Sequence, residues 1–460
     1  MKKIAVFFSV LTLYFFIALL AVTYLKDQKI LVVKGGTLID CTGKSPVENS
    51  IIIIEQKKIK AVSQVGKIRP PLFARTIDAR GKFIIPGLVD MHVHFLNESF
   101  SDLFLLNGVT TTRDMGNNID FIITLRDKIN QGILQGPSIF ASGYLINNRK
   151  IPFGASQYTA VVKNPKEARK IVALLARRKV DWIKIYMTLP RNLVRIIIKE
   201  ANKYKIPVAG HLRRVDAELA ARWGIRTLEH TTGVSEALLG EENFEDAPPL
   251  WTISNKTWLH VDRTKYEGLI DLFLKKNVYI TANLTLYQGL SSTPDELKNN
   301  PHIKLMPEIF QNGWKNYLSR HFLELTKDRE SWKITKKKIE EFIILFKEKG
   351  GKVLTGTDTP WPYLVPGFSL HKELELLVEA GFSPMEALLA ATKYPAEALN
   401  QEKNLGTLEE GKIANLILLN ANPLDDIRQT QNIDIVVKDG IVIQRERLYL
   451  SLLKRQKSSQ

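Results

Sequence analysis

The central part of the chain alternates short apolar stretches with amphipathic helical patterns, and this alternation is the feature that most restricts the folds open to it. It extends from Gly87 to about Ala398. In one repeat of the pattern, Asn164 is a suitable N-cap and Pro165 a suitable first helical residue, and an apolar strand follows near 181–186. Short strands that alternate with such helices are typical of βα units and a parallel sheet.

Eight candidate strands can be counted in this region. They fall near 88–94, 109–114, 138–142, 181–186, 207–211, 226–230, 277–283 and 352–358. Eight βα units of this kind predict a (β/α)₈ TIM barrel over residues 87–399. The last two strands are separated by a charged segment at about 284–350, which we expect to form helical insertions over the barrel mouth.

Both ends of the chain have a different, β-rich pattern. Near the N-terminus, short runs such as Ile51–Ile54 are separated by turns, and near the C-terminus Lys438-Asp439-Gly440 is typical of a tight hairpin turn. We therefore expect one small β-sandwich built from residues 27–86 and 400–450.

The first 26 residues contain an apolar run from Ile4 to Leu25, preceded by Lys2 and Lys3. A run of roughly 20 apolar residues is long enough to span a bilayer as a helix. The favoured interpretation is an uncleaved N-terminal membrane anchor, and the alternative is a cleaved signal peptide. Either would place the rest of the chain across the inner membrane, on the periplasmic side if the source is bacterial.

Composition adds a few limits. Lys and Arg number 65 against 48 Asp and Glu, which gives a net charge of +17. This excess suggests attraction to an anionic partner such as lipid headgroups, and the favoured alternative is a solvated basic face without a partner. The basic residues are scattered and no helix-turn-helix spacing occurs, so no nucleic-acid partner is expected. Because Cys41 is the single cysteine, an internal disulfide and a cysteine-based zinc cage are both excluded.

Residues able to bind metal coincide with the carboxyl ends of the candidate strands, where TIM-barrel active sites lie. His92 and His94 are two residues apart at the end of the first strand and should point to the same side. Lys184 lies in an apolar strand, where an unpaired ammonium group is costly. His211, His230 and Asp358 end three further strands. Together these residues predict a metal site.

The same residues resemble the metal-ligand pattern of the amidohydrolase superfamily. The sequences flanking them also resemble that family, for instance Thr37–Gly43 at the start of its β-sandwich and Gly108–Gly116 at its second strand. The resemblance extends over about 30–445. Within the superfamily, the chain looks like the imidazolonepropionase-related branch, which includes bacterial metal-dependent prolidases.

The resemblance implies a role for each ligand. Lys184 would be N6-carboxylated and would bridge two divalent metal ions, with zinc as the expected metal. His92, His94 and Asp358 would complete one metal site, and His211 and His230 the other. Asp358 would act as general base and then general acid for a water activated between the two metals.

Two further residues are predicted to bind substrate. Tyr186 follows Lys184 by two positions and should also face the barrel interior, although a barrel-packing tyrosine is the alternative. Arg113 ends the second strand and could hold a substrate carboxylate, and the alternative is an ion pair with a neighbouring acid.

The favoured function is a binuclear metal-dependent hydrolase of amide bonds, with dipeptidase or prolidase-like specificity and a small-molecule substrate. One alternative is a mononuclear hydrolase of cyclic amides or amidines, or a deaminase; Lys184 argues against it, because mononuclear members of the family generally lack that lysine. Another alternative is a catalytically silent, membrane-anchored binding protein, which would not need all six ligand positions. Oligomerisation is left open.

Overall fold

The computed structural model describes residues 12, 14–18, 21–22, 29–151, 155–240, 257–317 and 328–457. The predicted membrane-spanning run at 4–25 therefore lies largely outside the described residues. Within the described part of the chain, no helix is both long and apolar enough to cross a membrane. The anchor and the localisation inferred from it stay predictions.

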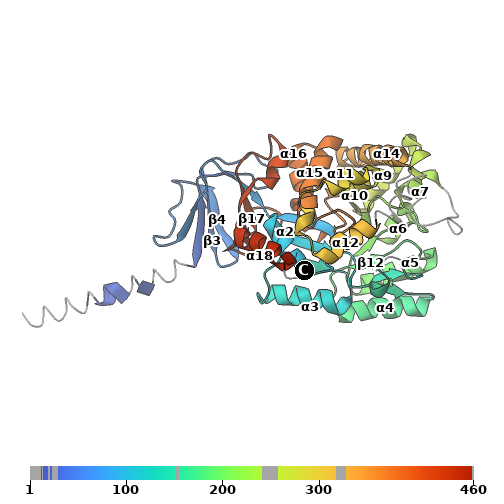
Figure 1. Ribbon diagram of the computed structural model, residues 1–460, viewed down its shortest axis with the longest axis horizontal. Coiled ribbons are helices and arrows are strands. Elements are labelled where there is room, and N and C mark those ends of the chain that lie inside the picture. The colour runs from blue at the N-terminus through green and yellow to red at the C-terminus, as the bar shows by residue number, and fades with distance from the viewer. Residues whose placement is uncertain are drawn as a thin grey trace, which may run out of the picture.

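Two small sheets lie at one end of the molecule, on the left of Figure 1. The first has the strand order β4-β3-β1-β5, with β4 Lys58–Gln64, β3 Ser50–Glu55, β1 Ile30–Lys34 and β5 Arg75–Asp78. The second has the order β19-β18-β17-β6-β2, with β19 Ile441–Val442, β18 Ile433–Lys438, β17 Leu416–Leu419, β6 Phe83–Pro86 and β2 Thr37–Leu38. The second sheet thus combines strands from both ends of the chain.

The two ends meet at one antiparallel pair. Strand β17 pairs with β6, so that Ile417 lies opposite Ile85. Side chains from both sheets, among them Val33, Ile52 and Leu416, share one hydrophobic core. The predicted hairpin is confirmed, because β18 and β19 pair across the turn at residues 439–440.

The central region contains two parallel sheets, and they hold strands at all eight predicted positions. The sheet β7-β8-β9 consists of Leu88–Val93, Val109–Asp114 and Ser138–Ala141. The sheet β11-β10-β12-β13-β14-β15-β16 consists of Thr159–Val161, Leu145–Asn147, Ile183–Ile185, Val208–Gly210, Thr227–Glu229, Tyr279–Thr281 and Val353–Leu354. All their pairings are parallel, as expected for βα units.

The two parallel sheets do not form one continuous closed ladder, but backbone hydrogen bonds connect them at both junctions. Beyond β9, the Ala141 carbonyl accepts from the amide of Asp181 at 2.8 Å. Beyond β7, the Met91 amide donates to the Thr355 carbonyl at 3.0 Å, and Val93 forms a parallel bridge with Thr359. The arrangement is consistent with the predicted (β/α)₈ barrel.

Strand β10 is the main addition to the eight predicted strands. It pairs with β12, while Ala141 at the end of β9 accepts from the Asp181 amide just before β12. Only three residues long and preceded by Gly143 at φ +66°, it gives no strand-length apolar signal.

Helices surround the parallel strands (Figure 1). They include α2 Phe100–Leu106, α3 Ile119–Asn130, α4 Pro165–Arg177, α5 Arg191–Lys203, α6 Ala217–Trp223, α7 Val234–Leu239, α9 Tyr266–Lys276, α15 Phe368–Ala380, α16 Pro384–Ala390, α17 Lys393–Ala398 and α18 Arg445–Lys457. The predicted start of α4 is confirmed, since the Asn164 side chain accepts from the Glu167 amide at 3.0 Å.

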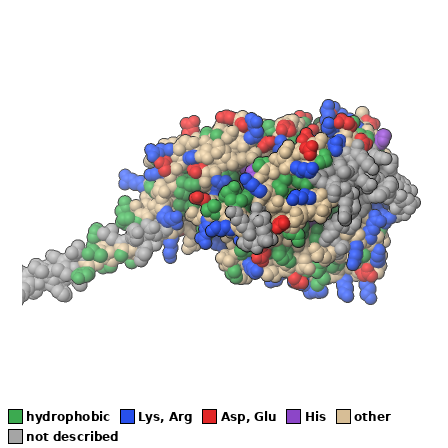
Figure 2. Space-filling view, in the orientation of Figure 1, with side chains coloured by type: hydrophobic (Ala, Val, Ile, Leu, Met, Phe, Trp, Pro, Cys, Tyr) green, Lys and Arg blue, Asp and Glu red, His purple; other side chains and the backbone are tan. Residues whose placement is uncertain are grey.

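The charged segment at 284–350 is helical where it is described. It contains α10 Leu284–Ser291, α11 Pro294–Lys298, α12 Glu308–Tyr317 and α14 Arg329–Glu348. Helix α14 buries one face, with Ile339, Phe342 and Phe346 in the main core. Figure 2 shows Lys and Arg side chains scattered among Asp and Glu over the visible face.

Candidate metal centre

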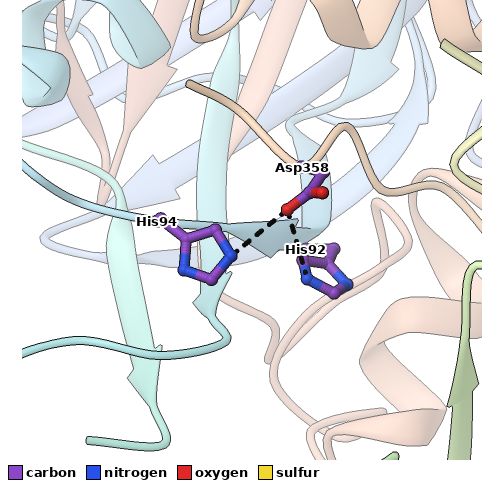
Figure 3. Close-up of side chains that lie close together, drawn as sticks. All are labelled: His92, His94 and Asp358. Carbon is purple, nitrogen blue, oxygen red and sulfur yellow. Dashed lines mark ion pairs between the residues drawn. The ribbon is translucent and has the colours of Figure 1, made fainter. Parts of the chain in front are cut away.

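Three predicted ligands converge at the carboxyl ends of β7 and β16 (Figure 3). Nε2 of His94 lies 3.2 Å and Nε2 of His92 lies 3.5 Å from Oδ1 of Asp358. One potential ligand atom from each of the three side chains lies within 4.8 Å of the others. Two imidazoles and a carboxylate at these separations could surround one divalent ion.

Local backbone structure explains why these side chains meet. Asp358 follows β16 in a left-handed conformation, with φ +60°, and its amide donates to the His92 carbonyl at 2.7 Å. Buried Asp90 ties the two segments together, because its carboxylate accepts from the amides of His92 and Thr357 at 3.2 and 3.1 Å. Burial raises the pKa of Asp90 to about 7, although these hydrogen bonds act in the opposite direction.

Lys184 is the central residue of β12 and is 1% exposed. Its ammonium nitrogen is buried and has no hydrogen-bond partner among the residues that the structure describes. Burial lowers the pKa of Lys184 to about 8, with Arg113 acting in the same direction and the carboxylates of Glu229 and Asp358 opposing it. An unpartnered cation in this position is unfavourable.

His211 and His230 directly follow β13 and β14. The two ring centroids are 4.8 Å apart, and the His230 ring lies 4.4 Å from that of His92. Nε2 of His230 is 4.0 Å from Asp358 Oδ2. The structure therefore brings the four predicted histidines and Asp358 to one end of the parallel strands.

Electrostatics favour neutral imidazoles at three of these positions. Burial, reinforced by the charge of Lys184, holds the pKa values of His92, His211 and His230 well below the usual range. Burial also acts to lower the pKa of His94, but the carboxylate of Asp358 outweighs it and the pKa is raised. A neutral imidazole has the lone pair that a metal requires.

The donor set fits divalent metal binding. Besides the Lys184 nitrogen, Nδ1 of His230 is buried without a hydrogen-bond partner in the described part of the chain. Nδ1 of His94 donates to the Gly116 carbonyl at 2.9 Å, which directs Nε2 toward Asp358, 3.2 Å from its Oδ1. Buried ring nitrogens that face one another and a carboxylate are the usual environment of a transition metal or zinc.

The two predicted substrate contacts lie in different environments. Tyr186 is partly buried, its ring centroid is 4.7 Å from that of His211, and burial raises the pKa of its hydroxyl. Arg113 is fully buried and donates to the side chain of Glu229 and the carbonyl of Met91, both at 2.7 Å. The acidic partner considered as the alternative for Arg113 is thus present.

The sequence interpretation missed two buried carboxylates that contact the predicted ligands. Asp90 contacts the backbone of His92, and Glu229 contacts the His92 ring, with Glu229 Oε2 2.7 Å from His92 Nδ1. Despite its burial, the pKa of Glu229 is lowered, because the charges of Arg113 and Lys184 outweigh desolvation. A charged residue within a short apolar strand was the available signal, the same signal that singled out Lys184.

A parallel-stranded fold with histidines and an aspartate at its strand ends defines a class of metal-dependent hydrolases. Comparison with known proteins makes this more specific: the profile of the amidohydrolase family matches residues 83–443. The chain therefore belongs to the amidohydrolase family and is a hydrolase that acts on carbon–nitrogen bonds.

Individual relatives support this assignment. The chain is 23% identical to the ochratoxinase of Aspergillus niger, over 88% of this chain and 84% of that protein. A putative prolidase from Bifidobacterium longum has a structure with TM-score 0.70 and 26% identity, covering 94% of this chain and 99% of the other. A Xaa-Pro dipeptidase with bound methionine has TM-score 0.67 and 24% identity, covering 90% and 99%.

Proposed function

We propose that this protein is a binuclear metal-dependent hydrolase of small-molecule amides, similar to a dipeptidase, and that Lys184 is carboxylated. The observation that carries the proposal is the environment of Lys184. Within the described ranges its nitrogen is buried without a hydrogen-bond partner, near the strand ends that also present four histidines and Asp358. A carbamate at this position would replace an uncompensated cation with an anion that two dications can share.

Carboxylation of Lys184 needs no reactant other than carbon dioxide. The neutral Lys184 amine attacks the carbon of CO₂, a nitrogen–carbon bond forms, and one proton leaves to solvent. The product carries a carboxylate with two oxygen donors. His92, His94 and Asp358 would hold one ion and His211 and His230 the other, with the carbamate between them.

When bound, the divalent ions would supply Lewis-acid activation of water and of the scissile carbonyl. Asp358 lies between His92 and His94 at the open end of the strands, with a side chain 12% exposed. From there its carboxylate would accept a proton from the attacking water and pass it to the leaving nitrogen.

The surroundings of Tyr186 indicate what kind of substrate group would lie beside it. Tyr186 packs against a small cluster formed by Leu145, Ile151 and Tyr158. These side chains offer apolar and aromatic surface next to the histidines, so we propose that the substrate carries an apolar or aromatic group near the scissile bond. A panel of dipeptides and N-acyl amino acids with apolar or charged side chains would test this, and equal hydrolysis of charged members would contradict it.

Metal stoichiometry tests the central proposal. Elemental analysis of the purified protein should give two divalent ions per chain, and uptake of metal by the stripped protein should require dissolved bicarbonate. Lys184→Ala should lose most bound metal and activity. Lys438→Ala is a matched control, because Lys438 is also a buried lysine but has Asp439 as an ion-pair partner at 2.6 Å, away from the histidines.

A mononuclear enzyme is the second candidate, and one observation favours it. His92, His94 and Asp358 by themselves form a cluster sufficient for one ion. One ion per chain, retained by Lys184→Ala and independent of bicarbonate, would support this candidate and overturn the carbamate. A protein that binds no metal and hydrolyses no amide would overturn both.

A further inference from the structure

A buried chain of charged groups lies directly behind His92. Glu229 Oε2 is 2.7 Å from His92 Nδ1, and Glu229 Oε1 accepts from the Arg113 guanidinium, also at 2.7 Å. Neither the Glu229 nor the Arg113 side chain is exposed, and that of His92 is only 2% exposed. The three residues come from β14, β8 and β7, so the contacts cross from one parallel sheet to the other.

The conformation of the chain after β14 allows both Glu229 and His230 to face the centre. Neighbouring residues in a regular strand point to opposite sides. Here β14 ends at Glu229, and His230 has φ +58°, in the left-handed region. The strand therefore ends between the two residues, and both side chains approach His92: the Glu229 carboxylate by its hydrogen bond and the His230 ring at a centroid distance of 4.4 Å.

Arg113 holds the Glu229 carboxylate in place. Its guanidinium also donates to the Met91 carbonyl at 2.7 Å and to the Thr227 hydroxyl at 3.0 Å, and it lies 4.5 Å from the centre of the Trp182 ring. Because these contacts fix the guanidinium, its hydrogen bond also fixes the Glu229 carboxylate. The orientation of Glu229 toward His92 is therefore set by packing as well as by charge.

We propose that Glu229, supported by Arg113, is a positioning residue that keeps His92 protonated at Nδ1 and presents Nε2 to the metal. A carboxylate oxygen can only accept, so the His92 Nδ1 must donate and Nε2 must carry the lone pair. Nε2 is the nitrogen that Figure 3 shows directed at Asp358, 3.5 Å from its oxygen. The inference rests on the proposed metal centre, but it holds for one bound ion as well as for two, because His92 belongs to the site in either case.

Glu229→Gln tests the inference. The replacement keeps size but can offer its amide group to Nδ1, which would turn the lone pair away from the metal. We expect metal affinity to fall roughly 10- to 100-fold, as for other partners of metal-bound histidines, with faster loss of metal to a chelator. The visible spectrum of the Co²⁺-substituted protein should also change, whereas a loss of stability that leaves the ligands in place would not alter it.

Glu373→Gln is the matched control. Glu373 is another fully buried glutamate, but its carboxylate accepts from the backbone amides of Leu284 and Thr285 at 2.9 and 2.8 Å and contacts none of the predicted ligands. This variant should keep the wild-type rate of metal loss and Co²⁺ spectrum. If Glu229→Gln behaves like Glu373→Gln, the inference is overturned.

A second variant keeps the inference testable if Glu229→Gln does not fold. Arg113→Lys keeps the positive charge but removes the fork that holds Glu229, and it should accelerate metal loss less than Glu229→Gln does. Wild-type kinetics in a folded Arg113→Lys protein would contradict the supporting role of Arg113. If the wild type binds metal and both variants lose it at the wild-type rate, only this inference is contradicted. If the wild type binds no metal, the proposed function is contradicted.

Discussion

At the scale of single residues, exposure distinguishes Asp358, which could bind metal and transfer protons, from the buried groups that could only orient their neighbours. Its Oδ1 lies near the Nε2 atoms of both His92 and His94, and its side chain is 12% exposed, whereas Glu229 and Arg113 behind His92 are enclosed. A group that is both beside the ligands and open to the strand ends can bind metal and move protons. The enclosed groups can only orient their neighbours.

Asp358→Asn should therefore damage chemistry more than folding. General base catalysis contributes roughly 10²- to 10⁴-fold, so we expect kcat for amide hydrolysis to fall by about that factor. The melting temperature of the stripped protein should change little. Asp78→Asn serves as control, since Asp78 pairs with Arg80 on the exposed surface. Near-wild-type kcat in Asp358→Asn would show that another group moves the proton.

Residue types at strand ends made the candidate ligands recognisable in the sequence, but not the contacts behind them. His92, Lys184 and Asp358 could be found because unusual side chains end or interrupt apolar strands. The partner of Arg113 could not be found in the sequence. Glu229 lies 116 positions further along the chain, and it reaches Arg113 only when the strands are assembled. Pairings across a barrel leave no local signal.

At the scale of elements, a buried histidine connects three segments of the outer layer. His371 in α15 contacts the Thr430 hydroxyl through Nδ1 at 3.0 Å and the Asn107 carbonyl, after α2, through Nε2 at 3.2 Å. Burial lowers its pKa to about 4. These contacts indicate a structural role for His371.

The lowered pKa of His371 makes the free energy of unfolding depend on pH. Between about 4 and 6.5 the unfolded chain binds a proton at this position and the folded chain does not, so stability falls as the pH drops through this window. From pH 7 to 5 we expect a loss of about 2 kcal/mol from His371. Urea unfolding of His371→Gln, which should be less stable at pH 7, should show a correspondingly smaller decrease. An equal decrease in both proteins would exclude His371 as the source.

The hairpin between β18 and β19 offers a second test of element packing. Gly440 has φ +75°, and a Cβ there would lie 2.0 Å from the Gln56 carbonyl oxygen. Gly440→Ala should cost roughly 1 kcal/mol for the left-handed conformation and more for the collision. Gly411 also has positive φ, +86°, but open space around it, so Gly411→Ala gives the conformational cost alone. Equal unfolding free energies of the two variants would contradict the collision.

Helix ends follow from the local sequence more directly than the two additional strands do. The end of α6 at Trp223, before Gly224 at φ +100°, follows from the glycine, and α4 from its cap. Strands β10 and β11 have three residues each; β11 pairs with β10 and β10 pairs with β12, so their existence depends on tertiary pairing rather than on their own sequence.

At the scale of the whole molecule, the candidate ligands come from both parallel sheets. His92 and His94 follow the β7 sheet, and His211 and His230 follow the other. Metal bound between them should therefore stabilise the assembly as well as the site. A ligand at 100 times its Kd adds about 2.7 kcal/mol, so removal of metal by a chelator should lower the melting temperature by several degrees.

Hydrogen exchange can locate this effect. Amides in β7 and in the segment 355–359, which hydrogen bond to one another, should lose protection when metal is removed. Amides in the sandwich sheets, for example in β3, should keep theirs and act as an internal control. Uniform loss of protection, or none, would contradict a metal centre that joins the two sheets.

The antiparallel pair of β6 and β17 has a consequence for biosynthesis. Strand β6 ends at Pro86, and its partner begins at Leu416, so the ribosome must release 329 intervening residues before this edge can be covered. Until then the nascent chain presents an unpaired apolar strand, Phe83–Ile85, to any other chain in the neighbourhood. We therefore expect a chain that lacks its last 45 residues to aggregate and to depend on chaperones, even though it keeps every candidate ligand.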